Sequence, residues 1–285
     1  MRLGSQPLKA CPSRSRRSSK RLTKPLRLDA ELVRRGLVAS RSEAGRAIQE
    51  GKVVVRGIPV TRAATLVPPE ASIAIAAPAQ PFVSRGGEKL EGALRSFAVE
   101  VAARRWLDAG ASTGGFTDCL LQRGAAEVAT VDVGYGQLDW RLRNDPRVTV
   151  IERTNVRTLA PEELPWRADG VVADLSFISL TLVLDALVNA AAEDADQILL
   201  VKPQFEVGRK AVGKGGVVRD PASWRAAIER VIHAATGIGL ALADVALAHP
   251  SGPAGNREFF VHLRRGIDPR LDTIDRALEE ASDEA

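Results

Sequence analysis

The sequence predicts an α/β protein, built on an open and mostly parallel sheet that follows a small α+β domain. Residues 104–134 (RRWLDAGASTGGFTDCLLQRGAAEVATVDVG) have the pattern of a buried strand, a glycine-rich turn, a helix and a second strand. Beyond them, apolar runs of strand length alternate with helical patterns up to residue 263. The third observation is a basic N-terminal segment with short elements of its own, which indicates a separate smaller domain.

Length and composition are those of an ordinary soluble protein with room for two domains. The chain has 285 residues, 45% of them hydrophobic and 26% charged, and no run approaches the roughly 18 apolar residues that a membrane span needs. No apolar segment follows the basic N-terminus, so a secretory signal is not expected. Cys11 and Cys119 indicate no disulfide framework, and the three histidines form no zinc-like cluster. We therefore expect a cytoplasmic protein without a membrane partner or a bound metal.

Positive charge is concentrated at the N-terminal end. Residues 1–62 carry 16 Lys+Arg and 4 Asp+Glu, a net charge of +12, whereas the remaining 223 residues carry 24 and 31, a net charge of −7. A cationic end of this kind favours binding to phosphate backbones, and such binding weakens steeply with salt. The alternative is a solvated basic segment without a partner.

The first 76 residues separate into a tail and a small domain. Residues 1–25 are rich in serine and arginine and have no periodicity, which predicts a disordered basic tail or a misplaced start codon. Residues 26–76 form the small domain, in which Ser40 and Glu43 have the spacing of a capping box. Its predicted elements are a helix marked by Leu28, Leu32, Val33 and Leu37, a helix from Ser40 to Gly51, two strands within 52–60 and a strand over 72–76.

The rest of the chain is predicted to be a linker, the α/β domain and a tail. Residues 77–84 contain two prolines and no clear period, as is typical of a linker. Residues 85–265 form the α/β domain, and residues 266–285 an acidic C-terminal tail. The later elements of the domain are strands near 148–151, 170–174, 197–202, 243–248 and 259–263, with helices across 180–192 and 221–236.

The glycine-rich turn predicts a nucleotide ligand of a particular kind. Gly110, Gly114 and Gly115 give the spacing G-x-x-x-G-G, which lets a ligand approach the backbone but lacks the pyrophosphate-binding spacing G-x-G-x-x-G. Asp132 follows Gly110 by 22 residues, where a carboxylate is able to accept the hydroxyls of a ribose. An adenosine-containing ligand without a pyrophosphate fits best, and S-adenosylmethionine is the obvious candidate. A tight turn without a ligand is the alternative.

Four charged residues are expected to converge on the same edge of the sheet. Asp174 and Lys202 each follow four apolar residues, at the carboxyl ends of parallel strands, where open α/β sheets bind ligands. Glu258 begins the final strand and reaches that edge if the strand is antiparallel. Lys89, from the helix before the sheet, lies close enough to complete the group. Ordinary ion pairs are the alternative interpretation.

The N-terminal domain resembles the S4 RNA-binding domain. The resemblance covers LRLDAELVRRGLVASRSEAGRAIQEGKVVVRGIPV, about the whole length of that fold. It implies two short helices on a small sheet, with basic residues facing structured RNA through its phosphates and shape. The residues expected on that face are Arg34, Arg35, Arg41, Arg46 and Lys52.

The α/β domain resembles the FtsJ/RrmJ ribose 2′-O-methyltransferases. The motifs are SRGGEKL, DAGASTGGFTD, DLSFISL, KPQFE and GNREF, and together with the S4 domain they resemble the TlyA group, a family also named hemolysin A. The resemblance implies a Rossmann-like domain that uses S-adenosylmethionine to methylate the 2′-oxygen of cytidines in ribosomal RNA, within ribosomal subunits. It also implies a catalytic tetrad of Lys89, Asp174, Lys202 and Glu258.

The same resemblance implies a set of cofactor-binding residues. They are Asp108, Gly110, Ser112, Gly114, Gly115, Phe116, Asp132 at the ribose, Asn155 near the adenine, and Asp174. The sequence departs from the family pattern at His249-Pro250-Ser251-Gly252, which changes the turn before Glu258.

Methyl transfer to a ribose oxygen needs a proton acceptor, because a 2′-hydroxyl is a poor nucleophile. Our hypothesis is that Lys202 takes this proton while the other three tetrad residues orient it. Phe177 and Phe205 are interpreted as either base-stacking or core residues. Two other functions stay open at this point: an inactive module that only binds RNA, and a membrane-active hemolysin. The sequence shows no amphipathic helix with a large apolar face, which argues against the hemolysin.

Overall fold

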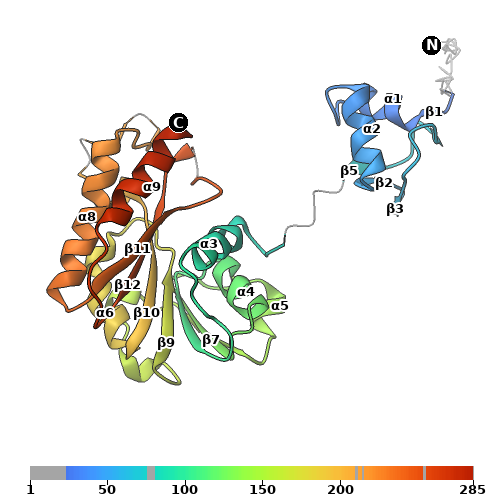
Figure 1. Ribbon diagram of the computed structural model, residues 1–285. Helices are drawn as coiled ribbons and strands as arrows, with labels where there is room; N and C mark the ends of the chain where they lie inside the picture. The colour runs from blue at the N-terminus through green and yellow to red at the C-terminus, as the bar shows by residue number, and fades with distance from the viewer. Residues whose placement is uncertain (1–23, 76–80, 209–210, 214, 253–254, 285) are drawn as a thin grey trace, which may run out of the picture. The chain divides into compact units, whose positions relative to one another are not determined.

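The computed structural model describes residues 24–75, 81–208, 211–213, 215–252 and 255–284. It contains two compact units, residues 1–79 and residues 80–285, which are shown in Figure 1. The basic tail expected over 1–25 therefore lies, except for its last two residues, outside the described residues.

The first unit packs two helices on short strands. Its elements are β1 (Leu26–Arg27), α1 (Leu28–Arg34), α2 (Arg41–Gln49), β2 (Val53–Val55), β3 (Ile58–Pro59), β4 (Leu66–Val67) and β5 (Ile73–Ile75). The three strands β3-β2-β5 form one antiparallel sheet, and β1 pairs with β4 in another. Ser40 Oγ accepts a hydrogen bond from Glu43 N at 3.2 Å, so the predicted cap of α2 is present. Leu28, Leu32 and Ile48 are fully buried between the helices and the sheet.

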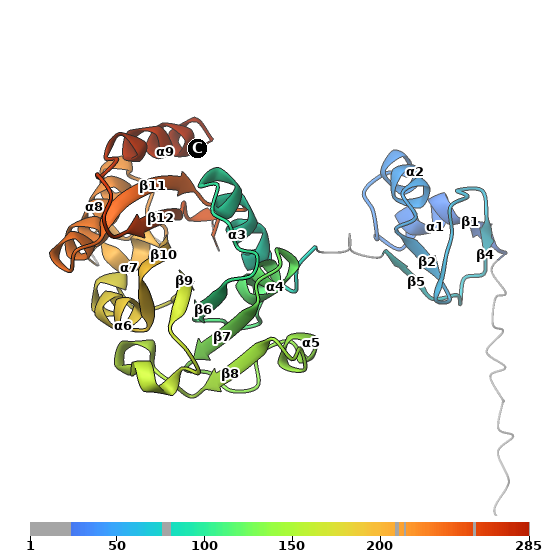
Figure 2. The ribbon, with the colours of Figure 1, turned by 60° about the horizontal axis from the view of Figure 1, so that its bottom comes forward.

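The second unit is a seven-stranded sheet with helices on both faces (Figure 2). Its strands are β6 (Arg105–Ala109), β7 (Glu127–Asp132), β8 (Val148–Glu152), β9 (Ala168–Ala173), β10 (Ala191–Val201), β11 (Ala241–Leu247) and β12 (Phe259–Arg264), in the order β11-β12-β10-β9-β6-β7-β8. Its helices are α3 (Arg85–Ser96), α4 (Gly115–Gln122), α5 (Trp140–Arg143), α6 (Leu184–Asn189), α7 (Pro203–Glu206), α8 (Pro221–Gly237) and α9 (Asp272–Asp283).

Two cores cover the two faces of this sheet. Helices α3 and α4 pack on one face, where Leu90 and Leu120 meet Trp106 of β6. Helices α6, α8 and α9 pack on the other face, where Ile228 meets Val261 of β12. Because both faces of the sheet are covered, its strands are nearly continuous apolar runs, and this pattern is what predicted them from the sequence.

The topology places a ligand crevice between β6 and β9. The chain runs from β6 outward to β7 and β8 and then returns to the other side of β6 with β9, so the strand order reverses there. Ligands of open α/β sheets bind at such a switch point, outside the carboxyl ends of the strands. Strand β12 is antiparallel to β10, with Phe259 opposite Val201, so its first residue lies at the same edge. The antiparallel arrangement required for Glu258 is confirmed.

Several boundaries differ from the prediction. The helix expected over 180–192 is a 3-10 turn, η3 (Leu180–Leu182), followed by the shorter α6, and β10 begins six residues earlier than expected. Helical propensity in the alanine-rich segment 190–192 is overridden by pairing, since Ala191 is in register with Ala168 of β9.

The expected linker and acidic tail are partly wrong. Within 77–84, Phe82 is 9% exposed and packs in the core under α3, and Val83 N donates to Asp118 at 2.8 Å, so these residues belong to the second unit. Within 266–285, helix α9 buries Ile274 and Ala277 against the sheet, because its acidic residues all lie on the opposite side of an apolar stripe.

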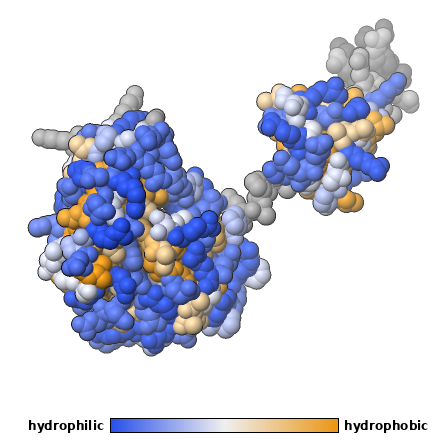
Figure 3. Space-filling view, viewed as in Figure 1, coloured by the Kyte–Doolittle hydropathy of each residue, from blue (hydrophilic) through white to orange (hydrophobic). Residues whose placement is uncertain are grey.

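The face of the molecule drawn in Figure 3 is mainly polar. On the face drawn in Figure 3, hydrophilic residues predominate and apolar ones form scattered groups. Among the helices of the described residues, none combines the length and the apolar character that crossing a bilayer requires.

Candidate active site

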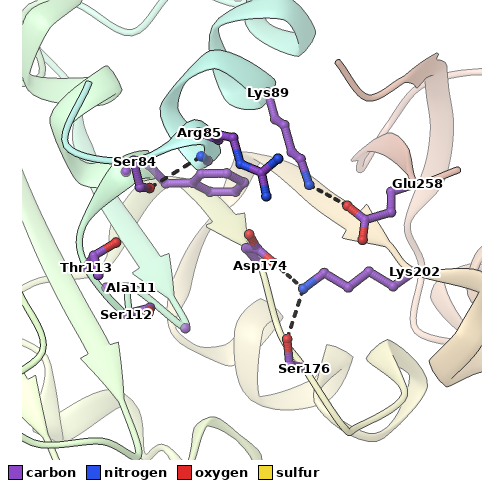
Figure 4. A pocket seen from close by; sticks show the side chains of 14 residues that line it. Ser84, Arg85, Lys89, Ala111, Ser112, Thr113, Asp174, Ser176, Lys202 and Glu258 are labelled. Carbon is purple, nitrogen blue, oxygen red and sulfur yellow. Dashed lines mark hydrogen bonds and ion pairs between the residues drawn. The ribbon is translucent and has the colours of Figure 1, made fainter. Parts of the chain in front are cut away.

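One cavity of about 290 Å³ opens at the switch point (Figure 4). It is bounded by the turn after β6, the start of α3 and the ends of β9, β10 and β12. The residues lining it are Ser84, Arg85, Gly86, Lys89, Gly110, Ala111, Ser112, Thr113, Gly115, Phe116, Asp174, Ser176, Lys202 and Glu258. All four residues of the predicted tetrad are among them, although Lys89 and Glu258 are 169 positions apart in the chain.

The four charged side chains form two ion pairs. Lys89 Nζ donates to Glu258 Oε2 at 2.5 Å. Lys202 Nζ lies 2.5 Å from Asp174 Oδ1 and donates to Ser176 Oγ at 3.0 Å, as Figure 4 shows. The structure thus brings the two lysines and two carboxylates together, as the strand ends predicted.

One carboxylate oxygen in this group keeps unused acceptor capacity. Glu258 is fully buried, and its Oε1 has no hydrogen-bond partner among the described residues. Asp174 Oδ1, in contrast, is already paired with Lys202 Nζ. A buried acceptor without a donor costs about 1–3 kcal/mol, so Glu258 Oε1 favours a ligand that brings a hydroxyl group into the cavity.

The turn after β6 needs glycine where it faces the cavity. Gly110 has φ +84°, and a Cβ there would lie 2.6 Å from the backbone oxygen of Asp174. A Cβ on Gly115 would lie 2.2 Å from Ser84 Oγ. Gly114 is required because a Cβ there would lie 2.3 Å from the side chain of Leu142, which does not line the cavity. At 110 and 115 glycine is therefore required by close contacts within the chain, and both residues also line the cavity.

Asp132 supports the turn from the neighbouring strand. Its Oδ2 accepts from Ser112 N at 2.8 Å, and its Oδ1 accepts from Gly134 N at 2.7 Å. Ser112 lines the cavity in a left-handed conformation with φ +49°, which this contact helps to hold. A carboxylate has about four acceptor positions, so two remain for a ligand.

Asp108 lies beneath the turn and does not line the cavity. It is fully buried, and its Oδ2 accepts from Thr117 N at 3.0 Å and from Thr117 Oγ1 at 2.6 Å. Burial raises the pKa of Asp108 to about 7, against the opposing effect of the hydrogen bonds from Thr117. The side chain joins the start of α4 to β6 through Oδ2, and its expected contact with a cofactor stays a prediction.

The predicted cofactor residues thus divide into two sets. Those that line the cavity are Gly110, Ser112, Gly115, Phe116 and Asp174, and those outside its lining are Asp108, Gly114, Asp132 and Asn155. Asn155 is exposed, and its Oδ1 accepts from Arg157 N at 3.0 Å, which caps the 3-10 turn η1 (Val156–Thr158).

Six lining residues were not predicted as site residues: Ser84, Arg85, Gly86, Ala111, Thr113 and Ser176. Ser84 and Arg85 stand at the start of α3, and Ser176 follows Asp174 by two residues. Ser176 lies in the loop after β9, and its Oγ accepts from Lys202 Nζ at 3.0 Å. Its position just beyond the end of a parallel strand was the signal that could have identified it.

An exposed aromatic side chain, that of Phe177, follows the cavity-lining residue Ser176. Phe177 is 91% exposed, so it is not a core residue, and its ring centroid lies 5.3 Å from that of Phe205. This arrangement leaves base stacking as the open interpretation for Phe177.

In the first unit, the predicted RNA-facing residues are not equivalent. Arg35 is an internal strut: it donates to Glu31 at 2.7 Å and to the backbone oxygens of Ala71 and Pro69 at 2.7 and 2.8 Å. Hydrogen bonds from Arg34, and then from Arg35, lower the pKa of the buried Glu31 to about 2. The expectation that Arg35 faces RNA is therefore wrong, since its guanidinium is committed to its own unit.

Arg34 pairs with Glu31 through Nε at 2.6 Å and Nη2 at 2.5 Å, whereas the other three predicted cations are more available. Arg46 is exposed and forms no ion pair within the described part of the chain. Arg41 is 63% exposed, 3.4 Å from Asp29, and Lys52 is 39% exposed, 2.6 Å from Glu50.

Comparison with known families gives this geometry its context. The FtsJ-like methyltransferase model matches residues 82–265, and the S4 domain model matches residues 26–73. The chain belongs to the FtsJ-like methyltransferase family. This FtsJ-like protein with an S4 domain is therefore a methyltransferase, and the predicted family is confirmed.

Individual relatives cover nearly the whole chain. The 16S/23S rRNA (cytidine-2′-O)-methyltransferase TlyA of Mycobacterium tuberculosis is 52% identical over 261 residues, which are 89% of this FtsJ-like chain and 97% of the relative. Hemolysin A of Brachyspira hyodysenteriae is 37% identical over 84% of this chain and 99% of its own. A solved structure of a proposed hemolysin from Streptococcus thermophilus has a TM-score of 0.70 and 35% identity, covering 92% of this chain and 97% of that one.

Proposed function

We propose that this protein methylates the ribose 2′-oxygen of a cytidine in ribosomal RNA, with S-adenosylmethionine as the methyl donor, in the cytoplasm. The observation that carries the proposal is the convergence of Lys89, Asp174, Lys202 and Glu258 on one cavity at the switch point. The activity named for the 52% identical relative supports the same reaction and the same nucleotide.

The residues present fit the proposed methyl donor. The backbone at Gly110 and Gly115 is closed to any Cβ and faces the cavity, and Asp132 holds the turn between them through Ser112 N. These residues, with Phe116, would hold the cofactor. S-adenosylmethionine, when bound, supplies an electrophilic methyl group.

The chain itself supplies proton transfer and orientation. Lys202 Nζ lies between Asp174 and Ser176, and in its neutral amine form it would receive the proton of a 2′-hydroxyl and become an ammonium paired with Asp174. The second lysine, Lys89, is paired with Glu258. Once Lys202 holds the proton, the group would carry two positive and two negative charges. Holding the hydroxyl at a fixed position next to Lys202 converts an encounter into an intramolecular step, which is where most of the acceleration would arise.

The direct test is substitution of the proton acceptor. We expect Lys202→Ala to abolish methyl transfer to ribosomal RNA while the Kd for S-adenosylmethionine stays within about 2-fold, because the glycine turn is unchanged. Transfer of labelled methyl groups measures turnover, isothermal titration measures binding, and nuclease digestion with mass spectrometry identifies 2′-O-methylcytidine. The matched control is Arg95→Ala, which removes a cation that is 77% exposed on α3 and outside the cavity.

Three outcomes would count against the proposal. Wild-type turnover by Lys202→Ala would overturn the assignment of the proton acceptor. Methylation of a base instead of the ribose would overturn the reaction. Failure of the wild-type protein to bind S-adenosylmethionine would favour the inactive RNA-binding module.

A further inference from the structure

A buried carboxylate behind the cavity joins the two loops that carry the active-site residues. Glu206 ends α7 and is 3% exposed, and it does not line the cavity. Its Oε2 accepts from Ser179 Oγ at 2.5 Å, and its Oε1 accepts from Leu180 N at 2.7 Å. Both oxygens are therefore committed to one short stretch of the loop that follows β9.

The two loops touch at three successive points. At the cavity, Lys202 contacts Asp174 and Ser176. Farther along, the rings of Phe205 and Phe177 lie 5.3 Å apart. Behind them, Glu206 makes the third contact, and the single turn of α7 links it to Lys202, since Phe205 N donates to the backbone oxygen of Lys202 at 2.9 Å. The loop after β9 is thus held against the loop after β10 from the cavity to the core.

The loop after β9 needs this anchoring because it is strained. Phe177 has φ +64°, a left-handed conformation that costs a non-glycine residue about 1 kcal/mol or more. Such a conformation persists only where the neighbours on both sides hold it. Ser176 is held by Lys202 on one side, and Ser179 is held by Glu206 on the other.

Stability alone does not explain a carboxylate at this position. Burial disfavours its charged form and raises the pKa of Glu206, although the hydrogen bonds from Ser179 and Leu180 oppose the shift. An apolar side chain of similar size often stabilises a core at least as well as a buried charge. It would, however, leave Leu180 N without an acceptor and release Ser179. The carboxylate therefore provides a defined geometry rather than a general gain in stability.

We propose that Glu206 is a positioning residue, which holds the strained loop of Asp174, Ser176 and Phe177 in register with Lys202. The inference rests on the proposed function, because it concerns the same site. Two residues of the KPQFE motif then have different roles. Lys202 would contact the substrate, and Glu206 would hold Asp174 and Ser176 in position beside Lys202.

The test compares three substitutions. Glu206→Ala removes both contacts, and we expect kcat for RNA methylation to fall about 10- to 100-fold, as displacement of reacting groups by about 1 Å does. Glu206→Gln should stay within about 3-fold of wild type, because its amide oxygen accepts from Leu180 N and its nitrogen donates to Ser179 Oγ. In both variants the Kd for S-adenosylmethionine should change less than about 2-fold, because neither substitution removes a residue that lines the cavity. Glu229→Ala, an exposed carboxylate of α8, is the control.

Retained wild-type kcat in Glu206→Ala would overturn the inference, as would parallel loss of cofactor binding and turnover, which marks a general structural role. If Glu206→Ala does not fold, Ser179→Ala takes its place. That variant removes one of the two contacts, and an unchanged kcat there would overturn the inference. A wild-type protein that forms no 2′-O-methylcytidine refutes the proposed function and this inference together, whereas wild-type activity matched by Glu206→Ala refutes the positioning role alone.

Discussion

At the scale of single residues, the cost of removing one member of an ion pair in this site depends on how exposed the remaining member is. The side chains of Lys202 and Asp174 are 11% and 27% exposed, whereas those of Lys89 and Glu258 are 9% and 0% exposed. Breaking a buried pair by removing one partner leaves an uncompensated charge, which costs about 3–5 kcal/mol. The cost is smaller where the remaining partner keeps contact with water, as Asp174 does and Glu258 does not. The two halves of the tetrad should therefore respond differently to substitution.

Lys89→Ala should lower both activity and stability, since it leaves Glu258 buried without its cation. We expect the free energy of unfolding to fall by about 3 kcal/mol or more, as measured by urea denaturation. Lys89→Ala combined with Glu258→Gln should recover much of that stability but none of the methyl transfer. Equal stability of the single and double variants would contradict the cost assigned here to the unpaired Glu258 carboxylate.

Asp108 makes a prediction about pH. Its pKa is raised to about 7 by burial, above the value of about 4 in an unfolded chain, so the folded protein holds this proton more tightly. The corresponding stability is complete below about pH 4 and is lost as the pH rises through about 7. In Asp108→Asn, unfolding free energy should therefore decline less than in wild type between pH 5 and pH 8. Parallel pH curves for the two proteins would contradict this role of Asp108.

At the scale of elements, the parallel strands were predictable and the short or solvated elements were not. Strand β9 is covered on both faces, so its apolar run GVVA stands out in any reading of the sequence. The two-residue strands β1 and β4 have no room for a period, and the four-residue α7 forms because Pro203 begins a turn beside Lys202.

The candidate site was likewise predictable in some residues and not in others. The positions of Asp174, Lys202 and Glu258 could be predicted because strand ends share one edge. The burial of Asp108 could not, since its packing beneath α4 depends on tertiary contacts with Thr117.

Helix α9 provides a test of an element that composition alone misidentified. Leu278 is 7% exposed in the core beneath β11, whereas Glu279 faces solvent. We expect Leu278→Ala to lower the free energy of unfolding by about 2–4 kcal/mol and Glu279→Ala to change it by less than about 0.5 kcal/mol. Thermal or urea denaturation measures both. Equal effects would mean that residues 266–285 behave as a tail after all.

At the scale of the whole molecule, charge is divided between the two units. The net charge of +12 in residues 1–62 contrasts with −7 in the rest of the chain. If the proposed function holds, the N-terminal end would supply the general attraction for RNA while the second unit carries the chemistry. Substitutions in the first unit should therefore change the affinity for RNA and its salt dependence, and leave cofactor binding unaffected.

Substitutions of Arg46 and Arg35 should have different effects, because Arg46 is predicted to contact RNA and Arg35 forms hydrogen bonds within its own unit. Arg46→Ala should weaken RNA binding at every salt concentration and reduce the slope of log K against log salt by about 0.7 to 0.9, as expected for one lost phosphate contact. Arg35→Ala should instead destabilise the first unit, because Arg35 donates to Glu31, Ala71 and Pro69 within it. Filter binding to ribosomal RNA over a salt series, beside thermal unfolding, distinguishes the two effects. An Arg46→Ala variant with an unchanged slope would place the RNA elsewhere on this unit, and Arg41 would then be the next cation to replace.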